Sequence, residues 1–294
     1  MRNSLSVPKK LFRYRSLRNS YSIQEIEKVL ERQQIFMASS DWVNDPFDFK
    51  PVYEKSSLRK INQRIKANTP NRKGISRQRM SELGGRKLSR SEYRELTKPT
   101  KKAPLLLAKL EDYASRETLK RLKSESLVTC FSEIGDNIPM WSHYADQHSG
   151  ACLEFDVEVD KRHDATEVPW RVLYTDDRPT LSTLDMMIFS DRHETQRHKT
   201  GSDRNESKSR VLEKLFLAKS IDWSYEREWR FFEYPGVGAR YKKLPCLKLA
   251  AITLGLRASD SKIEEILRRF GESVKVRRAI LSKSQFSINY QILS

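Results

Sequence analysis

Positive charge in this chain is concentrated in one stretch. Residues 55–123 contain 21 lysines and arginines against 6 aspartates and glutamates, a net charge of +15, while the whole chain of 294 residues carries +17. Glycines and prolines interrupt the stretch, and helix-like patterns lie at 58–65 and 105–122. We therefore expect a core domain formed by residues 1–54 and 124–294, with residues 55–123 as a helical basic insertion.

The residues on either side of this stretch alternate between strand-like and helix-like patterns. A short strand is predicted first, and Ser22 is expected to cap the helix that follows it. An amphipathic helix is predicted near the end of the chain. Strands are predicted at 11–16, 35–39, 127–132, 151–156, 228–232 and 247–256, and the late helix at 261–270. This order favours a mixed α/β (α+β) core.

A charge of this size attracts polyanions through long-range attraction and the release of counterions. Nucleic acid, bound through the Lys55 to Lys123 region, is the expected partner, and a merely solvated helical face is the alternative. The three cysteines form no paired framework, which fits a reducing cytosol. No stretch has the pattern of a signal peptide or the length of a membrane span, so we expect a cytoplasmic protein that does not enter membranes.

Four clusters combine polar and aromatic residues at the predicted strand ends. They are Arg13-Tyr14-Arg15, the segment from Ser39 to Asp48 with its Asn-Asp-Pro-Phe-Asp turn, Trp141-Ser142-His143-Tyr144, and Tyr225-Glu226-Arg227-Glu228-Trp229-Arg230. Together with Cys130-Phe131-Ser132 they resemble an uncharacterised bacterial domain family that shows these motifs in the same order. The resemblance covers residues 11–50 and 127–233, and the basic insertion lies outside it.

The same arrangement also resembles the plan of the ADP-ribosyltransferases, which implies a split sheet and NAD as co-substrate. By this resemblance Arg13 or Arg15 holds the diphosphate or ribose of NAD, and Tyr14 is the aromatic group on nicotinamide. Ser39 occupies the serine position of the second strand, although no Ser-Thr-Ser is present. Trp141 or His143 would hold a base or the nicotinamide ring by stacking.

The late Glu-x-Glu carries the chemistry in this interpretation. Departure of nicotinamide creates a ribosyl cation, which Glu228 would stabilise as a fixed carboxylate. If Glu226 lies on the same strand, the period of two places it on the same face, where it would orient or deprotonate the acceptor. The alternative is that both glutamates form ordinary salt bridges with Arg227 and Arg230.

The expected function is therefore transfer of ADP-ribose from NAD to a macromolecule, with nucleic acid favoured over protein. Toxin or phage-defence biology would follow from such chemistry, with an antitoxin or immunity partner that the sequence does not show. A noncatalytic nucleic-acid-binding module is the first alternative. A metal-dependent nuclease that uses Asp45, Asp48, Glu226 and Glu228 is the second. No metal site is expected, because Cys130, His143, His148 and Cys152 lack the close spacing of zinc ligands.

Overall fold

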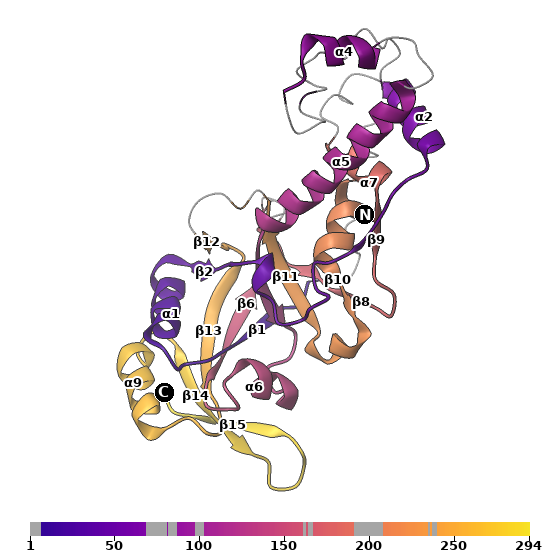
Figure 1. Cartoon of the computed structure of the whole chain (residues 1–294). Coiled ribbons are helices and arrows are strands. Elements are labelled where there is room, and N and C mark those ends of the chain that lie inside the picture. Colours follow the sequence, from indigo (N-terminus) through magenta and orange to yellow (C-terminus); the bar gives the residue numbers. More distant parts are fainter. Residues whose placement is uncertain are drawn as a thin grey trace. The chain divides into compact units, whose positions relative to one another are not determined.

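The computed structural model describes residues 7–68, 81, 87–97, 103–160, 163, 167–190, 208–234, 236 and 240–294. These residues divide into two compact units (Figure 1). The first, called the sheet unit, combines the described parts of 1–42, 126–174 and 219–294; the second, called the basic unit, combines those of 43–125 and 175–218. The described part of residues 55–123, the expected insertion, lies within the basic unit. The division of the chain at residues 55 and 123 remains a prediction.

A mostly antiparallel sheet of nine strands forms the centre of the sheet unit as far as its chain is described. Its order is β15-β14-β13-β6-β1-β5-β11-β7, with β3 also paired to β5, and only β13 and β14 run parallel. The strands are β1 (Lys10–Arg15), β3 (Ala38–Ser39), β5 (Leu127–Ser132), β6 (Ala151–Val157), β7 (Trp170–Arg171), β11 (Glu228–Glu233), β13 (Leu247–Leu254), β14 (Lys275–Leu281) and β15 (Ile288–Ile292). The fold is thus mixed α/β.

Helices cover both faces of this sheet. The helices α1 (Ser20–Arg32) and α9 (Asp260–Phe270) bury their apolar residues in one core with Leu11 of β1. The short helix α6 (Ile138–Tyr144) packs on the other face, where Trp141 contacts Tyr14 of β1. We call these the α1 face and the α6 face.

Two local features differ from the sequence prediction. The helix α1 begins before Ser22, because the side chain of Asn19 caps it by accepting a hydrogen bond from the Ser22 N–H at 3.2 Å. The single strand expected at 35–39 is divided: β2 (Gln34–Phe36) pairs with β12 (Tyr241–Lys243), whereas β3 pairs with β5. Pairing with distant strands, which local sequence does not reveal, decided this break.

The alternation of side chains along each strand assigns residues to the two faces. Neighbouring residues of a strand point to opposite faces, and directly paired residues of adjacent strands share one face. Ser132 pairs with both Phe12 and Glu228, so all three lie on the α6 face. Arg13 follows Phe12 and therefore lies on the α1 face, where its guanidinium stands over the ring of Phe131.

The basic unit is mainly helical. It contains α2 (Leu58–Asn68), α4 (Arg90–Thr97), α5 (Ala103–Ser124) and α7 (Thr183–Ser190), and a short parallel pair of β4 (Val52–Glu54) with β9 (Thr180–Ser182). A small core of Ile61, Leu88, Leu107 and Ala108 joins its helices. Tyr53 of β4 connects α5 and α7: its hydroxyl donates to Asp112 of α5 at 2.9 Å and lies 3.0 Å from the hydroxyl of Thr183 of α7. Across the described residues, no helix has both the length and the apolar character that crossing a bilayer requires.

Candidate functional site: a buried charge cluster

Four buried charged side chains of the sheet unit contact one another at the start of β11. Glu226 ends the 3₁₀ helix η5 (Ile221–Glu226), and Glu228 begins β11. Arg227 between them has a left-handed backbone with φ of 44°. Glu226 is therefore not on the strand, which corrects the expectation of two glutamates on one strand face. The turn at Arg227 nevertheless brings both carboxylates to the same lysine.

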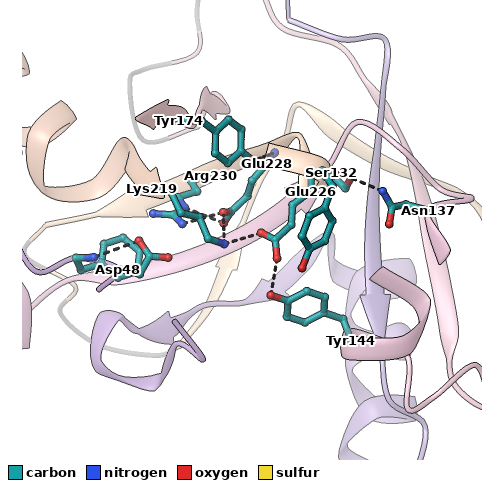
Figure 2. A network of polar contacts seen from close by, with 11 residues as sticks. Asp48, Ser132, Asn137, Tyr144, Tyr174, Lys219, Glu226, Glu228 and Arg230 are labelled. Carbon is teal, nitrogen blue, oxygen red and sulfur yellow. Dashed lines mark hydrogen bonds and ion pairs between the residues drawn. The ribbon is translucent and has the colours of Figure 1, made fainter. Parts of the chain in front are cut away.

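Lys219 bridges the two glutamates. It lies on β10 (Ala218–Ser220), which pairs with β8 (Leu173–Thr175), and its Nζ donates to Glu226 at 2.5 Å and to Glu228 at 3.0 Å (Figure 2). Arg230 donates to both oxygens of Glu228, from Nε at 2.7 Å and from Nη2 at 2.8 Å. We call Lys219, Glu226, Glu228 and Arg230 the charge cluster; none of them is more than 6% exposed. Two cations balance two carboxylates, as burial of charge requires.

The two carboxylates have opposite pKa shifts. Burial by itself would raise the pKa of Glu228, but the charges of Arg230 and Lys219 outweigh it and hold that pKa at about 2. For Glu226 burial dominates and raises the pKa; the neighbouring charge of Glu228 adds to this rise, and Lys219 and the hydrogen bond from Tyr144 oppose it only in part. The pKa of Glu228 is thus lowered and that of Glu226 raised, although both carboxylates bond the same lysine.

Hydrogen bonds from the α6 face fix the cluster in place. Tyr144 of α6 donates its hydroxyl to Glu226 at 2.6 Å, and Tyr174 accepts from the backbone N–H of Glu228 at 2.8 Å (Figure 2). Ser132 donates to the backbone carbonyl of Glu226 at 2.6 Å. Asn137, which caps α6, also donates to the carbonyl of Tyr225 at 2.9 Å. The helix α6 and the glutamate-bearing segment are therefore held together as one rigid site.

The basic residues predicted to hold a diphosphate lie on the other face of the sheet. Arg13 donates to Thr129 Oγ1 at 2.6 Å and to the carbonyl of Phe36 at 3.1 Å, and Arg13 and Arg15 both pair with the buried Glu25 of α1. Burial lowers the pKa of Arg13 to about 10, against the opposing effect of Glu25. Ser39 pairs with Leu127 on this same face. The sheet therefore separates Arg13, Arg15 and Ser39 from Glu228.

The predicted aromatic residues lie on the α6 face, but they are packed or exposed. Tyr14 is buried, with its hydroxyl donating to the carbonyl of Ile134 at 2.8 Å, and its ring meets Trp141 edge-on at 5.4 Å. Trp141 is fully buried and donates from Nε1 to the carbonyl of Gly135 at 3.0 Å. His143 is exposed at the end of α6 and contacts the ring of Tyr144. Tyr14 and Trp141 thus act as core residues here.

Sequence reasoning missed Lys219, the residue that links the two carboxylates. A signal was present, because this lysine directly follows the apolar run Leu215-Phe216-Leu217-Ala218, and a lysine that continues a buried run needs a buried acidic partner. Glu25 was missed as well. It is 3% exposed on the inner side of α1, where the two arginines of β1 neutralise it.

Comparison with known proteins gives one match. Residues 140–231 match the model of a family described as "Protein of unknown function (DUF2971)". The matched range contains the Trp141-Ser142-His143-Tyr144 segment and the whole charge cluster, and it does not reach the earlier motifs of residues 11–50. This supports a relation to an uncharacterised domain family. No curated protein and no solved structure matches the chain.

Proposed function

We propose that this protein binds nucleic acid through its basic unit. One observation carries the proposal: in the described part of that unit, exposed basic residues far outnumber exposed acidic ones. The exposed acidic residues are Glu54, Asp176 and Asp177. The exposed basic residues are Lys50, Lys55, Arg59, Lys60, Lys87, Arg90, Arg94, Lys109, Arg116, Lys120, Arg121, Arg178 and Arg210. Lysine and arginine at a surface contact phosphates of any sequence and release counterions from the nucleic acid.

A matched pair of charge reversals tests this function. The triple change Arg59→Glu, Lys60→Glu and Lys109→Glu alters exposed residues of the basic unit, while Lys243→Glu, Lys248→Glu and Lys275→Glu alters exposed residues of the sheet unit by the same total charge. We expect the first variant to lose at least about tenfold in affinity for labelled RNA and DNA in fluorescence anisotropy, because phosphate contacts are lost. Equal losses in both variants, or no binding by the unaltered protein, would refute the proposal.

We also retain transfer of ADP-ribose from NAD to that nucleic acid as a second proposal, together with the split-sheet plan that it implies. The supporting observation is the charge cluster, which holds an anionic Glu228 beside a Glu226 whose pKa is raised. A fixed carboxylate is suited to stabilising a ribosyl cation. The mechanism has one geometric requirement: Arg230 must release Glu228, since Arg230 alone bonds both of its carboxylate oxygens.

Release of nicotinamide from NAD, followed by chromatography with and without RNA or DNA, tests the second proposal. A product that disappears in Glu228→Gln while nucleic-acid binding persists would support it. Absence of nicotinamide under all of these conditions would leave the binding function alone. The nuclease alternative gains no support from geometry, because no three His, Cys, Asp or Glu residues in the described part of the chain gather as metal ligands do.

A further inference from the structure

A cavity of about 810 Å³ lies in the sheet unit, apart from the charge cluster. Its walls come from the start of α6, the loop that follows α6, the end of β13 and the connection between β14 and β15. The polar and aromatic residues that matter here are His148, Arg257, Arg278, Ser282, Gln285 and Phe286. Its volume falls within the range of small-molecule sites.

The charged residues that line this cavity are all basic or histidine. Arg257 is exposed and forms no ion pair with any described residue. Arg278 of β14 points to the α1 face, because its neighbour Ala279 packs with Trp141 on the α6 face, and its side chain has a contact of 3.8 Å to Asp260 of α9. No lining residue of the cavity carries a carboxylate. A ligand that fits this lining bears negative charge, and the guanidinium of Arg257 is suited to recognising phosphate oxygens.

His148 is held in this wall by a strained loop. Asp146, Gln147 and His148 all have positive φ, and the carbonyl of His148 accepts from the N–H of Arg257 at 2.9 Å. The imidazole stacks on Trp141 at 6.2 Å and shares a 3.1 Å hydrogen bond with Ser142, which leaves Nδ1 without a hydrogen-bond partner among the described residues. Three consecutive left-handed residues cost conformational energy, and such strain gathers at ligand sites.

An aromatic ring stands at the same cavity. Phe286, in the connection between β14 and β15, is fully exposed to solvent, although burial of a phenylalanine side chain is normally favourable. Exposed aromatic side chains beside basic residues are the usual platform on which a nucleobase stacks. Ser282 and Gln285 in the same connection add hydrogen-bonding groups.

We propose that this cavity binds a nucleotide, with its phosphate held by Arg257 and its base stacked on Phe286. The site is independent of the basic unit and of the nucleic-acid binding proposed for it. It also assigns a role to the loop after α6, because His148 and Arg257 are locked together by their backbone hydrogen bond.

Isothermal titration of the full chain with AMP, adenosine and inorganic phosphate tests the proposal. We expect AMP to bind more tightly than either fragment. The change Arg257→Gln should weaken AMP roughly tenfold, whereas Arg268→Gln, which removes one exposed arginine elsewhere in the sheet unit, should leave it unchanged. The change Phe286→Ala should weaken AMP roughly tenfold and leave inorganic phosphate unaffected. The control Tyr21→Ala, which removes another exposed aromatic side chain of the sheet unit, should change neither.

Three results would overturn the proposal. The first is the absence of heat with AMP at millimolar concentration. The second is equal affinity for AMP and inorganic phosphate, which would leave no role for the base. The third is loss of AMP binding in the basic-unit variant Arg59→Glu, Lys60→Glu and Lys109→Glu, which would place the nucleotide in the other unit. Retention of AMP binding in that variant supports a separate site.

Discussion

Glu226 and Glu228 are two residues apart and bond the same lysine, yet their surroundings give them opposite properties. Glu228 receives two hydrogen bonds from Arg230 and one from Lys219, so its charge is fully compensated. Glu226 receives one bond from Lys219 and one from the neutral Tyr144. The difference of one guanidinium accounts for the lowered pKa of Glu228 and the raised pKa of Glu226.

Replacement of each glutamate by glutamine separates these roles. Glu228→Gln leaves Arg230 and Lys219 buried with an uncompensated charge, and we expect it to lower the free energy of unfolding by about 3 to 5 kcal/mol. Glu226→Gln removes a carboxylate whose burial is unfavourable, and we expect a change of about 1 kcal/mol or less. Urea unfolding followed by circular dichroism measures both. Equal losses would show that the charge cluster does not distinguish the two residues.

The pH dependence of stability provides a second test at this scale. The pKa of Glu228 is about 2 in the folded chain, against 4.5 for a glutamate without these partners. The contribution of Glu228 to stability is therefore complete well above pH 4.5 and is lost as the pH falls toward 2. The shift corresponds to about 3 kcal/mol. The difference in unfolding free energy between the unaltered protein and Glu228→Gln should therefore shrink between pH 5 and pH 3. A constant difference over this range would contradict the ion pairing.

At the scale of elements, two glycines define the loop that carries His148. A side chain at Gly255 would place its Cβ 2.1 Å from the carbonyl oxygen of His148, and one at Gly150 would lie 2.2 Å from that of Arg15. Both obstacles are backbone atoms, which cannot move aside as a side chain can. The sequence indicates only a turn at Gly150, whereas the close approach of β1, β13 and this loop requires the glycines.

Gly255→Ala should therefore destabilise the sheet unit by about 1 to 3 kcal/mol, because the loop must shift to admit the methyl group. It should also weaken AMP binding, since His148 and Arg257 move with it. Gly135→Ala is the matched control: its Cβ would meet the ring of Phe12 at 2.6 Å, and a ring can rotate away. Thermal unfolding of the two variants compares them. A larger loss for Gly135→Ala would show that the loop yields more easily than the ring.

Across the whole molecule, positive charge is concentrated in one stretch. Residues 55–123, whose described part belongs to the basic unit, carry +15 of the total +17, so the rest of the chain is nearly balanced. Affinity for nucleic acid that arises from phosphate contacts falls steeply with salt. Contact with six phosphates would lower it by about 10³-fold between 50 and 200 mM salt. Anisotropy titrations over this range measure the slope, and salt-independent binding would point to a protein target instead.

Most of the long strands and helices, and the distribution of charge, could be predicted from the sequence alone. The runs at Leu127–Ser132 and Ala151–Val157 are β-rich and apolar enough to predict their strands, and the pattern at 105–122 predicts most of α5. These features depend on residues close together in the chain, where periodicity and composition carry the information. The helical patterns at 58–65 and 105–122 within the basic stretch could be predicted for the same reason.

Which residues contact one another depends on the three-dimensional fold and could not be predicted from the sequence. Arg13 and Tyr14 are adjacent in the sequence, but β1 sends Arg13 to Glu25 on the α1 face and Tyr14 to Trp141 on the α6 face. Ser132 shares the α6 face with Glu228 because β5 pairs with β11 in one particular register. Lys219 reaches both glutamates only because Arg227 turns the chain. Register and face are set by strand pairing between distant residues, and a shift by one residue would reverse every assignment.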